Sequence, residues 1–156
     1  MSALDLRALL ETLTRHDVRF VIVGAVAVAA HGYVRGTADL DIVPDDDRAN
    51  LKRLRAALVE LGSTLPLAEN RPFDPARDAA ALESHKNVTL DTRLGGLDVM
   101  QRTPGIPTYD ELDREAIQSD LMGVPVRVCS LRHLRAMKDA AGRPQDLLDL
   151  SNLPEV

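Results

Sequence analysis

Aspartates set between apolar residues are the part of this sequence best suited to chemistry. In the stretch Ala38–Val43, acidic and aliphatic side chains alternate. A strand directs successive side chains to opposite faces, so Asp39 and Asp41 would project from one face and Leu40 and Ile42 from the other. Two carboxylates whose Cα atoms lie about 7 Å apart can ligate one or two divalent cations. Pairs of such cations are the usual device for phosphoryl transfer.

Asp98 repeats this pattern, because it lies between Leu97 and Val99 in a second apolar alternation. If the two strands are neighbours, three carboxylates form a cluster whose mutual repulsion is costly without a bound cation such as Mg²⁺. Asp91, in the same predicted hairpin, is the alternative third carboxylate. A second alternative is that the Asp-x-Asp pair lies on the solvated outer face of an edge strand.

The segment before these aspartates predicts a phosphate site. Phe20–Val23 is a continuous apolar run typical of a buried strand, and a helix rich in small residues begins directly at Gly24. Free backbone N–H groups at the positive end of that helix would point at whatever lies above the strand. The alternative is that Gly24 serves only the geometry of the turn.

The elements that must position these residues alternate between helix and strand. Residues 63–86 contain three prolines and no sustained period, which makes them the longest candidate for a flexible segment. The remaining order predicts an α/β (α+β-like) domain with one mixed sheet flanked by helices. Predicted helices cover residues 4–16, 25–31, 48–61, 108–116 and 130–141, with a last short one ending at residue 150. Predicted strands cover residues 20–23, 38–43, 87–91, 97–101 and 124–129, and a hairpin across Gly95-Gly96 joins the third strand to the fourth.

Composition restricts the partners of the chain. Its 156 residues fit one domain over residues 1–156, with residues 130–156 as a C-terminal helical segment. Nineteen basic against 24 acidic residues give a net charge of −5, so the protein as a whole does not attract nucleic acid or an anionic membrane. Aromatic residues are 3% of the chain, which disfavours a stacking platform for single strands.

The sequence also predicts a cytoplasmic location. Cys129 is the only cysteine, so it forms no intramolecular disulfide and is expected to be a buried thiol in a reducing compartment. The first residues lack the pattern of a secretory signal. The longest apolar run, Phe20–Ala30, has eleven residues, whereas a membrane span needs roughly 20.

Taken together, these residues resemble a known superfamily. Gly24-Ala25, followed by Asp39-Leu40-Asp41-Ile42 and later by Leu97-Asp98-Val99, is similar to the motif order of polymerase-β-type nucleotidyltransferases. The likeness is greatest to the minimal members and to the bacterial AbiEii-like toxin group, whose Arg-x-Thr-x-Asp-x-Asp form is similar to residues 35–41. These motifs span residues 20–101, about half of the chain.

The resemblance implies a nucleotidyltransferase fold and roles for the matched residues. Asp39 and Asp41 would bind two Mg²⁺ ions, or Mn²⁺, together with the triphosphate of an NTP such as ATP. Asp98 would complete the metal site and, with Asp41, deprotonate an acceptor hydroxyl that attacks the α-phosphorus. Gly24 and the turn after it would hold the β and γ phosphates. Ala25 replaces the usual second Gly or Ser, which removes a hydroxyl contact and leaves the backbone contacts.

The C-terminal segment carries a second likeness. Residues 138–146 resemble the Lys-x-x-Ala-x-Arg-x-x-Asp ending of AbiEii-like proteins. It implies that Lys138 and Arg143 neutralise triphosphate charge and that Asp146 fixes one of them. The alternative is an ordinary exposed helix end. Arg35 and Thr37, from the first motif, would contact the nucleotide, unless Arg35 instead anchors its loop to a carboxylate.

The predicted function is Mg²⁺-dependent transfer of an NMP from an NTP to a hydroxyl acceptor. The acceptor implied by the family is RNA, a protein or a small molecule, and the AbiEii likeness implies a toxin partnered by an antitoxin. The alternatives are an inactive nucleotide-binding or partner-binding module of the same fold, and a two-metal phosphohydrolase or nuclease. No membrane partner is expected.

Overall fold

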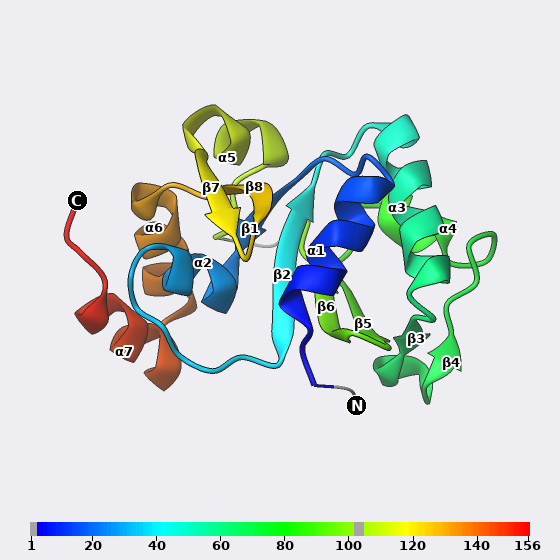
Figure 1. The fold of residues 1–156 in the computed structure, drawn as a ribbon, viewed down its shortest axis with the longest axis horizontal. Coiled ribbons are helices and arrows are strands. Elements are labelled where there is room, and N and C mark those ends of the chain that lie inside the picture. The colour runs from blue at the N-terminus through cyan, green and yellow to red at the C-terminus, as the bar shows by residue number, and fades with distance from the viewer. Residues whose placement is uncertain (1–2, 102–104) are drawn as a thin grey trace.

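The computed structural model describes residues 3–101 and 105–156, and its elements are shown in Figure 1. The helices of this part of the chain are α1 (Leu6–Arg15), α2 (Gly24–Ala30), α3 (Arg48–Glu60), the 3-10 helix η1 (Pro66–Ala68), α4 (Ala79–Glu83), α5 (Tyr109–Glu115), α6 (Leu131–Ala141) and α7 (Pro144–Asn152). The strands are β1 (Phe20–Val23), β2 (Asp39–Pro44), β3 (Thr64–Leu65), β4 (Arg71–Pro72), β5 (Val88–Thr92), β6 (Gly95–Val99), β7 (Ile117–Leu121) and β8 (Val124–Val128).

All of these strands join one mixed sheet, as predicted. Its order is β4-β3-β5-β6-β2-β1-β8-β7. β2 is central, because it pairs antiparallel with β1 and parallel with β6. In Figure 1, α2, α6 and α7 gather to the left of β2, whereas α3 and α4 lie to its right; α6 packs on both α2 and α7. The site residues predicted near residues 24–41 and 138–146 therefore come from neighbouring elements.

The alternation of β2 and β6 separates an apolar face from a polar face. Leu40 and Ile42 of β2 and Leu97 of β6 are fully buried in the core with α1 and α3 leucines. Burying a side chain of this size contributes about 1.5 to 3 kcal/mol. Asp41 and Asp98, on the opposite face, remain partly exposed. The period-2 prediction for both strands is therefore confirmed, and the core packing fixes which face carries the carboxylates.

Side-chain caps begin helices α3 and α6. Asp47 accepts a hydrogen bond from the Asn50 backbone N–H at the start of α3, and Ser130 accepts one from His133 N–H at the start of α6. Each bond satisfies one of the free amide groups of the first turn. Asp45 and Asp46 lie before the cap of α3 and outside its first turn.

Three local predictions were wrong. Residues 63–86, predicted to be irregular, contain β3, η1, β4 and α4 with turns and loops between them; each of the two strands has two residues, too few to show a period. β7 was missed, because it is an edge strand with largely exposed side chains and therefore lacks apolar alternation. The β5–β6 turn is Arg93-Leu94, and Gly95-Gly96 belongs to β6 instead.

Two smaller expectations can be compared with the structure. Cys129 is fully buried, and burial raises the pKa of its thiol to about 12. Among the helices of residues 3–101 and 105–156, none combines the length and the apolar character that a bilayer crossing requires.

Candidate active site

The predicted site residues meet in one cavity of about 300 Å³ on the polar face of β2 and β6. Only Gly24 of the predicted set is not in its lining; it lines an adjoining, more apolar cavity of about 230 Å³. Asp41, Lys138, Arg143 and Asp146 line both cavities and form the boundary between them. The lining of the first cavity consists of Ala25, Arg35, Thr37, Asp39, Asp41, Asp98, Lys138, Arg143, Gln145 and Asp146.

Asp41 and Asp98 form a carboxyl pair across two parallel strands. They are in register between β2 and β6, whose neighbouring backbones are about 4.8 Å apart. Burial raises the pKa of Asp41 to about 7, with further contributions from a hydrogen bond to Asp98 and from the charges of Asp98 and Asp39. Lys138 opposes this rise. The pair is therefore able to hold a proton near neutral pH, which two separate surface carboxylates do not do.

Asp39 lies beside this pair, opposite Gly96 rather than opposite a carboxylate. A Cβ atom on Gly96 would be 2.9 Å from Asp39 Cγ, so the carboxylate of Asp39 occupies the space of the missing side chain. Burial raises the pKa of Asp39, and so do the nearby charges of Asp98 and Asp91. Asp91 pairs with Gly96 from the neighbouring strand β5, and it does not line the cavity. Asp98 therefore has the position predicted for the third carboxylate.

Gly24 makes room for the other aspartate of β2. It has a φ of +69°, and a Cβ atom at this position would lie 2.8 Å from Asp41 Cγ. A side chain on residue 24 would thus be strained in its backbone and would displace Asp41. The next residue, Ala25, is buried at the start of α2. The backbone turn places Gly24 against Asp41, and its predicted contact with phosphate stays a prediction.

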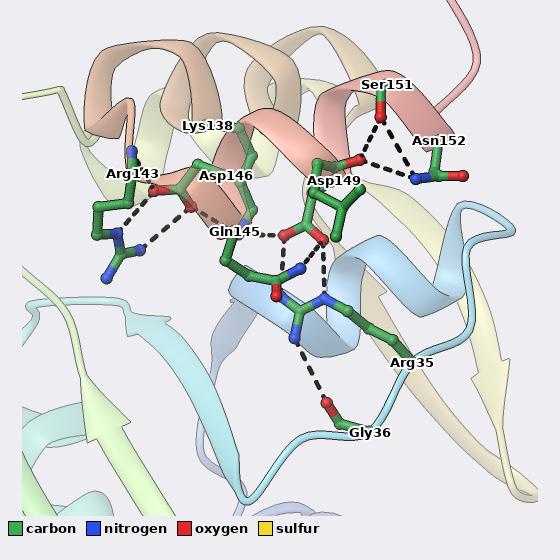
Figure 2. Close-up of polar contacts among 10 residues, drawn as sticks. Arg35, Gly36, Lys138, Arg143, Gln145, Asp146, Asp149, Ser151 and Asn152 are labelled. Carbon is green, nitrogen blue, oxygen red and sulfur yellow. Dashed lines mark hydrogen bonds and ion pairs between the residues drawn. The ribbon is translucent and has the colours of Figure 1, made fainter.

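The cations of the C-terminal segment are already paired with aspartates, as Figure 2 shows. Lys138 Nζ lies 3.2 Å from Asp146 Oδ1, and Arg143 Nε donates to Asp146 Oδ2 at 2.6 Å. Burial by itself would raise the pKa of Asp146, but the hydrogen bonds from Arg143 and Lys138 outweigh it and lower that pKa. Asp146 therefore fixes both cations, where the sequence predicted one. Lys138 is buried and Arg143 is exposed. The alternative prediction of an ordinary exposed helix end therefore applies to Arg143 and not to Lys138.

Arg35 is anchored to a carboxylate that the sequence did not single out. Its Nε and Nη2 atoms donate to the two oxygens of Asp149 on α7, both at 2.8 Å. The Thr37 hydroxyl bonds to the backbone of Asp39 at the entry to β2, which is a structural use of this group. The anchoring alternative for Arg35 is thus the one present in the structure.

Three residues of the site were missed: Asp149, Gln145 and Gly96. Gln145 donates through Nε2 to Asp149 Oδ1 at 2.9 Å and lines the cavity. The spacing of Asp146 and Asp149 puts both on one face of a helix, which was an available signal. Gly96 was assigned to a turn together with Gly95, although a glycine within a strand often marks a close approach of another group.

The donors in this cavity suit a divalent cation of the Mg²⁺ type. Mg²⁺ prefers carboxylate oxygens, and the charges of Asp98 and Asp39 that help to raise the pKa of Asp41 are negative charges that a cation would neutralise. Within residues 3–101 and 105–156, however, no three carboxylate, histidine or cysteine side chains are grouped around one point. An ion bound by two of these aspartates would complete its coordination with water or phosphate oxygens, as Mg²⁺ commonly does.

Solved structures with the same arrangement of elements exist. No protein-family model and no curated protein matches this sequence. A Thermotoga maritima protein, TM1012, described as a candidate nucleotidyltransferase, superimposes with a TM-score of 0.58 at 15% identity over 94% of this chain and 88% of its own. This chain has a nucleotidyltransferase fold. The ANT(2″)-Ia protein in complex with adenylyl-2″-tobramycin also has a TM-score of 0.58, at 14% identity over 94% of this chain and 83% of its own.

Proposed function

We propose that this protein is a nucleotidyltransferase that moves an NMP group from an NTP to a hydroxyl acceptor with the help of Mg²⁺. The observation that carries the proposal is the in-register pair of Asp41 and Asp98, with Asp39 beside it and with Lys138 and Arg143 lining the same cavity. Support comes from the fold shared with TM1012 and with ANT(2″)-Ia, the latter in complex with a nucleotide-derived product.

Each wall of the cavity would have its own part in the reaction. Lys138 and Arg143 would face the phosphate oxygens of the NTP, where positive charge stabilises the transition state of phosphoryl transfer. Asp98 would orient the acceptor hydroxyl and accept its proton as the new O–P bond forms. The bond between the α-phosphorus and the bridging oxygen breaks, and pyrophosphate leaves with the electron pair.

Asp39, Asp41 and Asp98 would hold the Mg²⁺ ions. Bound there, the cation would polarise the phosphoryl oxygens and offset the charge that three carboxylates place beside a polyanion. The raised pKa of Asp41 is consistent with this role, because a bound cation would take the place of the proton that the raised pKa favours on Asp41. Nucleotide binding is therefore expected to depend strongly on the cation.

Calorimetric titration with each of the four ribonucleoside triphosphates tests the proposal. The wild type should bind a nucleotide with Mg²⁺ and bind it at least tenfold more weakly in EDTA. The Asp39→Asn, Asp41→Asn double variant should lose the Mg²⁺-dependent part. Asp139→Asn is the matched control, since Asp139 is exposed on α6 and outside the cavity lining.

Pyrophosphate release distinguishes the proposal from its alternatives. The wild type, supplied with pools of RNA, protein and small hydroxyl compounds, should release pyrophosphate with one of them, and Asp98→Asn should not. Nucleotide affinity without pyrophosphate release, insensitive to Asp98→Asn, would indicate an inactive binding module. Phosphate or strand cleavage without NTP would indicate a two-metal hydrolase instead. The toxin role is tested separately, by the growth of cells that express the wild type or the double variant.

A further inference from the structure

Asp149 of α7 is a carboxylate with no exposure to solvent and with a donor at every side. Its Oδ1 atom accepts from Arg35 Nε at 2.8 Å and from Gln145 Nε2 at 2.9 Å. Its Oδ2 atom accepts from Arg35 Nη2 at 2.8 Å and lies 3.0 Å from Lys138 Nζ. Figure 2 shows these contacts converging on Asp149 from the loop before β2, from α6 and from α7 itself. Both oxygens are thus fully used.

These contacts keep Asp149 charged. Burial would raise its pKa, but hydrogen bonds from Arg35, Lys138 and Gln145 outweigh burial and lower the pKa to about 2. The planar fork of Arg35 meets both carboxylate oxygens at once, which a lysine in its place could not do. A buried charge is costly to leave unpaired, so moving Arg35 or Lys138 away from Asp149 is unfavourable.

Asp149 is not part of the cavity lining, whereas its two cationic partners are. Arg35 belongs to the loop between α2 and β2, which leads through Thr37 to Asp39. Lys138 projects from α6 toward the same cavity and acts on the charge of Asp41. Asp149, which lies outside the cavity lining, thus sets the positions of Arg35 and Lys138, which are part of that lining.

We propose that Asp149 is a positioning residue for this cavity: it fixes Arg35 and Lys138 so that both cations face the phosphates of the bound substrate. α7 is by this argument an integral part of the site. The identity of the ligand as a phosphate compound rests on the proposed function, and the tether itself rests on the contacts of Asp149. The two can therefore be tested apart.

Trypsin provides a test of the tether that does not need activity. Arg35 precedes Gly36 in a loop whose alternate residues are exposed, and such loops are preferred sites of cleavage. Trypsin must take the arginine side chain into its own acidic pocket, and in the wild type Asp149 already holds that side chain. Asp149→Asn should therefore be cut at the Arg35–Gly36 bond at least tenfold faster than the wild type. Mass spectrometry of the fragments 1–35 and 36–156 identifies this cut.

Asp146→Asn is the matched control, since Asp146 lies on the same helix and is equally buried but does not bond to Arg35. It should leave cleavage at Arg35–Gly36 within about threefold of the wild type. If Asp149→Asn does not fold, Arg35→Lys serves instead, because it keeps a trypsin site and leaves Asp149 paired with Lys138; it should also be cut faster. Unchanged cleavage at residue 35 in the folded variant overturns the tether.

Nucleotide affinity then tests the positioning role. Asp149→Asn should weaken Mg²⁺-dependent ATP binding at least tenfold, and Arg35→Lys in that background should weaken it little further, because both changes remove the same contact. Faster cleavage with unchanged affinity would make the tether purely structural and overturn the proposal. If the wild type binds none of the four nucleotides, the proposed function fails, and the cleavage result alone decides on the tether.

Discussion

Replacing Asp41 by asparagine should stabilise the metal-free protein at pH 8 and leave it nearly unchanged at pH 4. The pKa of Asp41 is raised from the ordinary 3.8 to about 7, chiefly by burial and then by Asp98. A carboxyl whose pKa is higher in the folded state favours folding while it is protonated. This stability is complete below about pH 4 and is lost as the pH rises through 7. Asparagine has the shape of the protonated carboxyl and does not ionise.

The size of the effect follows from the pKa difference. A rise of about three pH units corresponds to roughly 4 kcal/mol between the two protonation states. Asp41 is partly exposed to solvent, which screens its interactions and reduces the effect. We therefore expect Asp41→Asn to raise the free energy of unfolding by about 1 to 3 kcal/mol at pH 8, and by less than about 0.5 kcal/mol at pH 4.

Urea unfolding followed by circular dichroism, in EDTA at pH 4, 6 and 8, measures this difference. Asp139→Asn, an exposed change on α6, should stay within about 0.5 kcal/mol of the wild type at every pH. Adding Mg²⁺ at pH 8 should stabilise the wild type more than the variant, since a ligand stabilises the state that binds it. A gain from Asp41→Asn that is the same at pH 4 and pH 8, or a loss at pH 8, would refute the reasoning.

Three further predictions concern the packing around the carboxylates. Gly24→Ala should cost at least about 1 kcal/mol more in urea unfolding than Gly62→Ala, because both glycines have φ values near +60° but only the Gly24 Cβ would meet Asp41; equal costs would contradict this. Gly96→Ala should destabilise the wild type but be nearly neutral in an Asp39→Ala background, with a coupling of about 1 kcal/mol or more in a double-mutant cycle; additive effects would count against it. Cys129, fully buried with its thiol pKa raised to about 12, should react with a disulfide reagent at least 100-fold more slowly in the native protein than in urea, and equal rates would contradict its burial.

Local periodicity predicted the polar face of the sheet but not its assembly. The alternation around Asp41 and Asp98 was sufficient to assign each carboxylate to one face, because the opposite face is apolar in both strands. That β2 and β6 pair in parallel, with these two residues in register, depends on packing between segments 57 residues apart in the chain and has no local signal. The position of Asp39 over Gly96 follows from the same register.

The C-terminal helix shows why the remaining site residues could not be predicted. In α7 the leucines 147 and 148 are about half exposed, at 55% and 48%, whereas Asp146 and Asp149 are buried. Apolar periodicity alone predicts that these leucines are buried, whereas the structure exposes them and buries the two aspartates. Three cations stabilise this arrangement: Arg35 and Lys138 come from other segments, and Arg143 is the N-cap residue of α7. These partners are apparent only once the chain is folded.

The buried aspartates of α7 also have a consequence for how the protein is synthesised. The strands that carry Asp39, Asp41 and Asp98 leave the ribosome well before residues 146 and 149. Until α7 follows, Lys138 and Arg35 lack the carboxylate that holds them, and the acidic strands lack an ordered cationic wall. A chain interrupted before α7 therefore contains every catalytic candidate and yet no assembled cavity. Translation therefore has to pass through α7, residues 144–152, before the cavity of the proposed active site can assemble.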